Sequence, residues 1–136
     1  MTTRKLIALD IDGTVLHEDG TLPDAALAQV HRLRDAGHEV MLATGRSVAM
    51  TLSVLDRLDI TPAYVVASNG AILLKRDPDA PTGYRRHHVE TFDPTAVLTS
   101  IRPHLTHANY AVEDETGVYR YTGWFPDGAL GAVSHE

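Results

Sequence analysis

The chain has 136 residues, of which 43% are hydrophobic, and its net charge at neutral pH is -6. This length is sufficient for one domain with a real core, and no apolar run approaches the roughly 20 residues that a membrane span needs. The negative charge argues against nucleic-acid binding, and the absence of cysteine excludes disulfides, thiol nucleophiles and cysteine-bound metals. Residues 1–5 show no signal-peptide pattern, so we expect a cytoplasmic location.

The first predicted element is a short buried strand that begins at Leu6 and ends in two carboxylates, Asp10 and Asp12. In open α/β sheets the ligand site lies beyond the carboxyl ends of the strands, which places both carboxylates at the mouth of a pocket. One carboxylate there can attack phosphorus, the other can transfer a proton, and their crowded charges would suit Mg²⁺. In the simpler interpretation, the two residues only end the strand and begin a turn at Gly13.

The sequence DIDGT at residues 10–14 resembles the first motif of the haloacid dehalogenase superfamily of phosphohydrolases, and details further along resemble its Cof-type (IIB) branch. The resemblance implies that Asp10 is the nucleophile and Asp12 the general acid/base. It also implies that Mg²⁺ is held by Asp10 and by the backbone carbonyl of Asp12. Gly13 and Thr14 would belong to the loop that holds the phosphate.

Two elements are predicted after this motif. Residues 15–22, with an Asp-Gly turn pair at 19–20, predict a small hairpin or flap over the pocket. Pro23 then opens a helix that continues to Ala36, with apolar residues near one face and Gly37 as its stop.

A second buried strand is predicted over residues 39–43. The β-α-β order makes it parallel to the first strand, so Thr44 should emerge at the same edge as Asp10. The segment resembles the second motif of the same family, which implies that Thr44 and Gly45 bind the transferring phosphoryl group. Arg46 matches the Thr-Gly-Arg form of the Cof-type branch and is assigned to the substrate pocket, with a surface or structural arginine as the alternative.

A helix capped by Ser47 and continuing to Leu58 leads to a third strand over residues 63–67. Asn69 and Gly70 follow this strand. The resemblance extends here and implies that Asn69 lines the active-site entrance. The alternative is that Asn69 and Gly70 form only a tight turn into a hairpin.

Two domains are predicted in this α/β chain. Residues 1–89 form the N-terminal part of a Rossmann-like haloacid dehalogenase core, a parallel sheet with flanking helices, and residues 90–136 begin an α/β cap. The remaining predicted elements are a hairpin with arms at 71–74 and 84–89, a helix from Asp93 to Leu105, and two strands at 110–113 and 118–121.

Two later motifs of the family have no counterpart in this sequence. The third supplies a lysine and the fourth one or two aspartates for Mg²⁺, both after the cap. Lys5 and Lys75 lack a suitable setting, and Asp114 and Asp127 belong to turns. We therefore expect the chain to be a fragment of a longer phosphatase or to be completed by another chain, and its open sheet edges to favour self-association.

The functional prediction is a Mg²⁺-dependent phosphomonoester hydrolase that acts on a small phosphorylated metabolite through an aspartyl phosphate at Asp10. Three alternatives remain: a phosphotransferase or phosphomutase of the same fold, a receiver-like phospho-acceptor module, and an inactive binding or assembly remnant. Sugar phosphates, nucleotides and cofactor phosphates are all candidate substrates.

Overall fold

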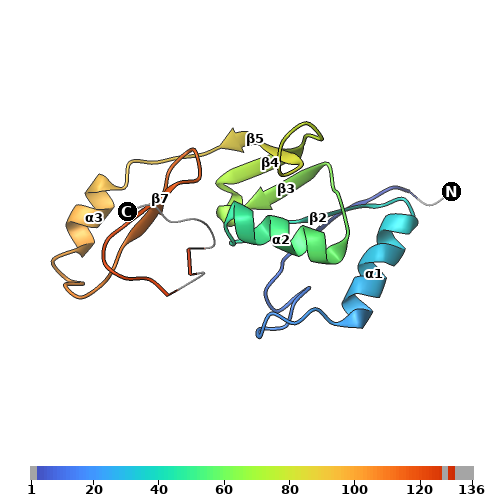
Figure 1. Cartoon of the computed structure of the whole chain (residues 1–136), viewed down its shortest axis with the longest axis horizontal. Coiled ribbons are helices and arrows are strands. Elements are labelled where there is room, and N and C mark those ends of the chain that lie inside the picture. The colour runs from blue at the N-terminus through green and yellow to red at the C-terminus, as the bar shows by residue number, and fades with distance from the viewer. Residues whose placement is uncertain (1–2, 127–128, 131–136) are drawn as a thin grey trace. The chain divides into compact units, whose positions relative to one another are not determined.

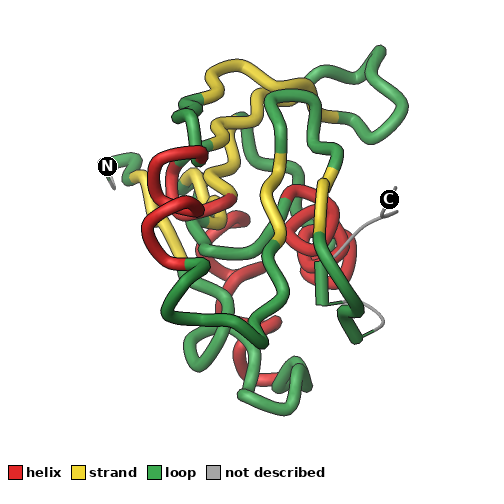
Figure 2. Tube along the Cα trace, turned by 90° about the vertical axis from the view of Figure 1, so that its left-hand side faces the viewer, coloured by secondary structure: helices red, strands yellow, loops and turns green. Residues whose placement is uncertain are grey.

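The computed structural model describes residues 3–126 and 129–130 and divides the chain into two compact units, Met1–Val89 and Glu90–Glu136. Asp127, which the sequence assigns to a turn, lies outside the described residues. Figure 1 labels most of the helices and strands, and Figure 2 shows how loops and turns connect them within each unit.

The first unit alternates strands and helices before it ends in a hairpin (Figure 1). Its elements are β1 (Leu6–Leu9), α1 (Asp24–Asp35), β2 (Glu39–Leu42), α2 (Val48–Leu58), β3 (Tyr64–Ala67), the short 3₁₀ turn η1 (Ser68–Gly70), β4 (Ile72–Arg76) and β5 (Tyr84–Val89). The predicted α/β class is confirmed.

Parallel pairing joins the first three strands. β1 and β2 are parallel neighbours, with Leu6 opposite Glu39 at the start of the pairing. Just beyond β2, Ala43 forms a parallel bridge with Val66 of β3, and the backbone amide of Thr44 donates to the Val66 carbonyl at 3.0 Å. β4 and β5 continue from β3 as antiparallel strands. Because the first three strands share one direction, the loops that follow them lie at the same edge.

The core of the first unit lies between one sheet face and the helices. α2 places buried side chains on one face at helical spacing, and β3 and β4 bury alternate residues. Three consecutive residues of β2 are buried, whereas no residue of β1 is, so the burial predicted for the first strand was wrong. The cluster joins Val54, Leu55 and Leu58 of α2 to Leu42 of β2, Val65 of β3 and Leu74 of β4.

Capping residues fix where the two long helices begin and end. The Ser47 hydroxyl accepts from the backbone amide of Met50 at 3.5 Å, which confirms the predicted cap of α2. α2 ends at Asp59, which adopts a left-handed conformation. α1 begins after Pro23 and stops before Gly37, which has a φ of +86° that favours glycine. Among the described residues, no helix combines the length and apolar character needed to cross a membrane.

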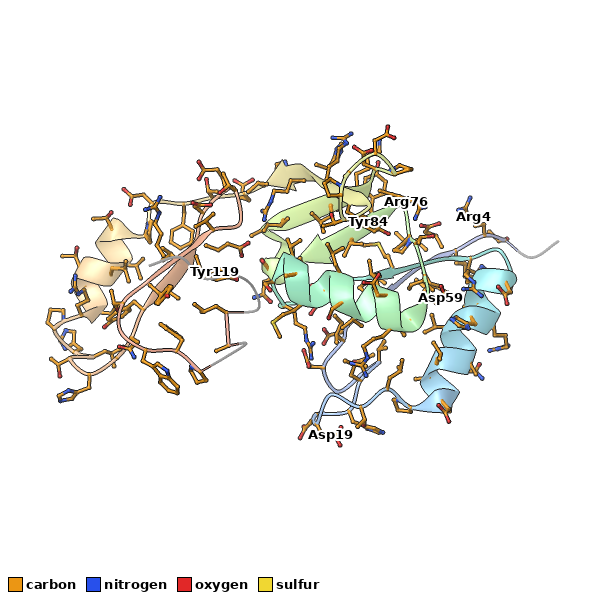
Figure 3. The ribbon with its side chains drawn as sticks, viewed as in Figure 1. Arg4, Asp19, Asp59, Arg76, Tyr84 and Tyr119 are labelled. Atoms are coloured by element: carbon orange, nitrogen blue, oxygen red, sulfur yellow. The ribbon has the colours of Figure 1, made fainter. Side chains whose placement is uncertain are left out.

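The segment after the first aspartates differs from the predicted flap. Val15 and Leu16 are buried in the core, so these apolar residues anchor the loop and do not form a hairpin strand. A turn follows at the end of the loop, closed by the backbone amide of His17, which donates to the Thr21 carbonyl at 2.9 Å. Asp19 lies at the tip of this turn (Figure 3). The structure therefore contains no hairpin strands over residues 15–22, because the two apolar residues enter the core, whereas the predicted turn at Asp19 and Gly20 is confirmed.

The second unit is small. It contains α3 (Thr95–Ile101) and an antiparallel pair, β6 (Ala111–Glu113) and β7 (Tyr119–Tyr121). The turn between the two strands is held by the Asp114 carboxylate, which accepts from the backbone amide of Thr116 at 2.9 Å. The helix stops earlier than predicted: Pro103 has no amide proton to continue it, and Leu105 lies beyond its end.

The contrast between buried and exposed leucines gives a test of this core. Leu58 is 0% exposed and Leu6 is 66% exposed. We expect Leu58→Ala to lower the free energy of unfolding by about 2–5 kcal/mol, because it leaves a cavity in the core. Leu6→Ala, the same chemical change, should cost no more than about 0.5 kcal/mol. Urea denaturation of both variants measures the difference, and equal losses would contradict the core described here.

Candidate active site

A pocket of about 420 Å³ lies where the segments at the ends of β1, β2 and β3 meet. Among the described residues that line it, Asp10 is the only charged one. The lining residues are Asp10, Ala43, Thr44, Gly45, Val66, Asn69 and Gly70. The pocket therefore lies at the edge of the sheet where the parallel strands end, as the strand order predicts.

The first loop holds Asp10 at the pocket. The backbone amide of Ile11 donates to one oxygen of the Asp10 carboxylate at 2.8 Å. Ile11 itself is fully buried in the core, which anchors the chain directly between Asp10 and Asp12. The carboxylate of Asp10 is thus fixed at the end of β1, next to the space that a ligand would fill.

Thr44 is buried in the pocket wall and is held from three sides. Its amide donates to the Val66 carbonyl, and its carbonyl accepts from the backbone amide of Asn69 at 3.0 Å. Its hydroxyl oxygen accepts from the backbone amide of Arg46 at 3.1 Å. The hydroxyl proton is not used in this bond, so Thr44 can still donate to a ligand oxygen.

Asn69 lies in the turn after β3 and also forms part of the pocket wall. Asn69 has a φ of +56°, a left-handed conformation that asparagine tolerates better than most residues. Its side chain lies against Gly45, where an added Cβ would come within 2.8 Å of the Asn69 amide oxygen. The sequence left two interpretations of Asn69 open, and both apply: the residue makes the turn and lines the pocket.

Arg46 and Asp12 bind each other. The Nε of Arg46 donates to one oxygen of the Asp12 carboxylate at 2.9 Å, and Nη2 donates to the other at 2.5 Å. These hydrogen bonds from Arg46 lower the pKa of Asp12 and raise that of Arg46. Neither residue lines the pocket, so the guanidinium assigned to the substrate pocket is instead paired with the second aspartate.

Gly13 and Thr14 are also absent from the pocket wall. The backbone amide of Gly13 donates to the Leu16 carbonyl at 2.9 Å, and that of Thr14 donates to the Ile11 carbonyl at 3.2 Å. Both amides thus stabilise their own loop. Gly13 has a φ of +72°, which is the turn that the sequence assigned to it.

Three wall residues were not among the predicted site residues: Ala43, Val66 and Gly70. Ala43 and Gly70 are sequence neighbours of Thr44 and Asn69, so the predicted strand ends could have identified them. Val66 lies inside a strand, and only its pairing with Ala43 reveals that it borders the pocket.

The oxygen atoms near the pocket fit Mg²⁺ in kind. Mg²⁺ prefers oxygen ligands and commonly takes one or two from protein while keeping water and substrate phosphate in the other positions. The Asp10 carboxylate and the Asp12 carbonyl are donors of this type. Within residues 3–126 and 129–130, no group of three histidine, aspartate or glutamate side chains could hold a metal.

The fold and the site together define an α/β protein with an aspartate beyond its first parallel strand and a threonine beyond its second. A model of the haloacid dehalogenase-like hydrolase family matches residues 7–123. The chain therefore belongs to this family, and the resemblance noted from its sequence is confirmed.

Relatives of known sequence and structure support this assignment. The phosphatase YwpJ of Bacillus subtilis is 36% identical over 121 residues, covering 87% of this chain and 39% of the relative. The 5-amino-6-(5-phospho-D-ribitylamino)uracil phosphatase YitU of the same species is 35% identical over 83 residues, covering 61% of this chain and 29% of the relative. A solved haloacid dehalogenase-like hydrolase from B. subtilis has a TM-score of 0.59 at 27% identity, covering 78% of this chain and 35% of that one. The chain thus spans well under half of the length of each.

The contact between Gly45 and Asn69 gives a test of the pocket wall. Gly45→Ala adds a Cβ that would collide with the Asn69 side chain. We expect this substitution to displace the exposed Asn69 amide and to lower the free energy of unfolding by about 1 kcal/mol at most. In an Asn69→Ala background the same substitution should cost clearly less, because the colliding amide is gone. Chemical denaturation of the two single variants and the double variant measures this coupling. Strictly additive losses would show that the two residues do not touch.

The pair of Arg46 and Asp12 also predicts a pH dependence. Because folding lowers the pKa of Asp12, the pair stabilises the protein above the ordinary aspartate pKa of about 3.9. This stability is lost as the pH falls through the lower pKa of the folded state. We expect Arg46→Gln to raise the pKa of Asp12 in an NMR titration of the side-chain carboxyl. The matched control is Asp114, whose pKa is lowered by Thr116 and should not respond. The loss of stability at neutral pH should not exceed about 1 kcal/mol, because the Asp12 side chain is more than half exposed to solvent.

Proposed function

We propose that this chain carries the nucleophile of a Mg²⁺-dependent phosphomonoester hydrolase that acts on a small phosphorylated metabolite. One observation carries the proposal: the Asp10 carboxylate and the Thr44 hydroxyl line the same pocket at the ends of parallel strands. The site thus combines a fixed nucleophile with a donor for phosphoryl oxygen, which are two of the groups that phosphoryl transfer requires.

In the first step, an oxygen of Asp10 attacks phosphorus in line with the ester bond. An Asp10–phosphorus bond forms, the bond between phosphorus and the ester oxygen breaks, and Asp12 gives its proton to the departing oxygen. In the second step water attacks the same phosphorus, Asp12 takes the proton of that water, and Asp10 is released. The Thr44 hydroxyl donates a hydrogen bond to a phosphoryl oxygen in both steps. The Asp10 carboxylate and the Asp12 carbonyl would hold Mg²⁺, which would supply positive charge next to the phosphate.

The proposed proton transfer requires Asp12 to leave Arg46. A carboxylate held by two hydrogen bonds from a guanidinium is stabilised in its ionised form, and its lowered pKa reflects this. Asp12 therefore cannot donate a proton efficiently while the pair persists.

The proposed substrate class follows from the relatives. The name of YitU describes a phosphatase of a ribitylamino uracil phosphate, which is a small phosphorylated metabolite. We further propose that the unit formed by residues 90–136 begins the cap that selects the substrate. Support comes from its α/β content, with a helix followed by an antiparallel pair.

The proposal includes completion by further protein segments, from a longer chain or another copy. Among the described strands, β1 pairs with β2 alone, and its first side chain, Leu6, is exposed. The other side of β1 is therefore an open edge that an additional strand could pair with. Parallel sheets are also normally covered on both faces, which an added segment would help to do. A cytoplasmic location remains a prediction from the sequence.

Hydrolysis of p-nitrophenyl phosphate tests the proposed function. We expect the 136-residue chain to hydrolyse it slowly and only with Mg²⁺, because each missing charge-stabilising group typically contributes about 10²–10³-fold in rate. Asp10→Asn should reduce this rate at least about a hundredfold further, because it removes the nucleophile. Asp35→Asn is the matched control: it makes the same change on α1, where Asp35 pairs with Arg34. Hydrolysis that does not need Mg²⁺, or that is equally fast in the Asp10→Asn and control variants, would refute the proposal.

A further inference from the structure

The pocket has an unbalanced charge. A phosphate dianion would lie beside the Asp10 carboxylate, and none of the seven described residues that line the pocket is a lysine or arginine. The three loops at this edge comprise residues 10–16, 43–47 and 67–71, and Arg46 is the only lysine or arginine in them. These loops thus hold one cation for three anions: Asp10, Asp12 and a bound phosphate.

The backbone of Arg46 is fixed next to the pocket. Its amide donates to the Thr44 hydroxyl, and its carbonyl accepts from the backbone amide of Ser68 at 2.8 Å. Thr44 and Gly45, the two residues before it, line the pocket. A guanidinium on this backbone can therefore change partners by rotation of its own side chain, with no movement of the wall.

Solvent reaches the present pair mainly from the side of Asp12. The Asp12 side chain is 56% exposed and that of Arg46 20%, and solvent-exposed ion pairs typically contribute about 1 kcal/mol or less. A phosphate dianion offers the same two-oxygen geometry with twice the charge, and arginine binds it bidentately. Competition between a bound phosphate and Asp12 therefore favours the phosphate.

We propose that Arg46 exchanges partners: it holds the Asp12 carboxylate while the pocket is empty and turns to the phosphate group that binds beside Asp10. This inference rests on the proposed phosphate site. The exchange makes Arg46 a positioning residue, because phosphate binding releases Asp12 for the proton transfer described above. Asp12 would then become available only when a substrate is in place.

Binding of inorganic phosphate to four proteins tests the exchange: the wild type, Asp12→Asn, Arg46→Gln and the double variant. Isothermal titration at neutral pH without Mg²⁺ measures each affinity. We expect Asp12→Asn to bind phosphate about fivefold more tightly, which is the factor that about 1 kcal/mol represents, because Arg46 no longer has a competing partner. Arg46→Gln should bind about tenfold more weakly or worse. In the Arg46→Gln background, Asp12→Asn should bring little or no gain.

The double variant separates the exchange from simple repulsion. If loss of the Asp12 charge alone attracted phosphate, Asp12→Asn would tighten binding equally with or without Arg46, and the exchange would be wrong. No tightening in Asp12→Asn would show that Arg46 is a fixed structural clamp, which also overturns it. Asp35→Asn removes one charge elsewhere in the same unit and should not change the affinity.

Two further measurements keep the outcomes distinct. Arg46→Lys retains the charge without the two-pronged geometry, so it should bind phosphate with intermediate affinity; thermal unfolding checks that each variant folds. If Asp12→Asn raises the phosphate affinity equally with Arg46 and with Gln at position 46, the exchange is rejected, but the proposed hydrolase stays in place. If no variant binds phosphate, the phosphate site and the exchange both fail, and the hydrolysis assay with Asp10→Asn judges the function separately.

Discussion

The candidate site depends on the parallel pairing of three short strands. β1 pairs with β2 along four residues, but β2 reaches β3 through one bridge, from Ala43 to Val66, and the adjoining hydrogen bond from Thr44. This pairing makes three strands point the same way and brings their loops to one edge. The α1 and α2 crossovers make it feasible, because parallel strands need a long connection between them. Without it, Asp10 and Thr44 would share no pocket.

Backbone hydrogen bonds then fix the wall of the pocket. The loop after β2 and the loop after β3 exchange two of them, from Ser68 to Arg46 and from Asn69 to Thr44. These bonds need no ligand, so they hold the wall and its Thr44 hydroxyl in position in advance, as electrostatic catalysis at the proposed phosphate site would require. The ion pair of Arg46 and Asp12 is different in kind, because it joins two partly exposed side chains. The site therefore combines a rigid wall with a side-chain contact that can open.

Much of the fold could be predicted because its signals are local. Apolar runs located β1, β2 and β3. Pro23 and Gly37 marked helix ends through their backbone preferences, and Ser47 through its capping side chain. The flap prediction failed for the opposite reason. Whether Val15 and Leu16 cover a pocket or enter a core depends on the surrounding structure, which a run of two apolar residues does not reveal.

The residues of the candidate site could be predicted from local signals, but their contacts could not. Asp10, Thr44 and Asn69 follow strand ends, and the parallel order alone places them together. The partner of Arg46 was not predictable, because Asp12 lies 34 residues away and the contact depends on two side-chain conformations. The approach of Asn69 to Gly45 likewise depends on how two loops cross. A motif can thus identify the residues of a site without showing which of them bind one another.

The strand that carries Asp10 is also the least covered strand of the parallel group. Side chains of β1 are exposed or half-buried, whereas three of the four residues of β2 are buried. A strand with this little cover is the part of the sheet where added protein would bury the most apolar surface. Any segment that paired with β1 would run beside Asp10, the proposed nucleophile, so one contact would both stabilise the fold and bring further side chains to the proposed phosphate site. For this reason the open edge of β1 and the shortage of cations at the pocket are best understood together.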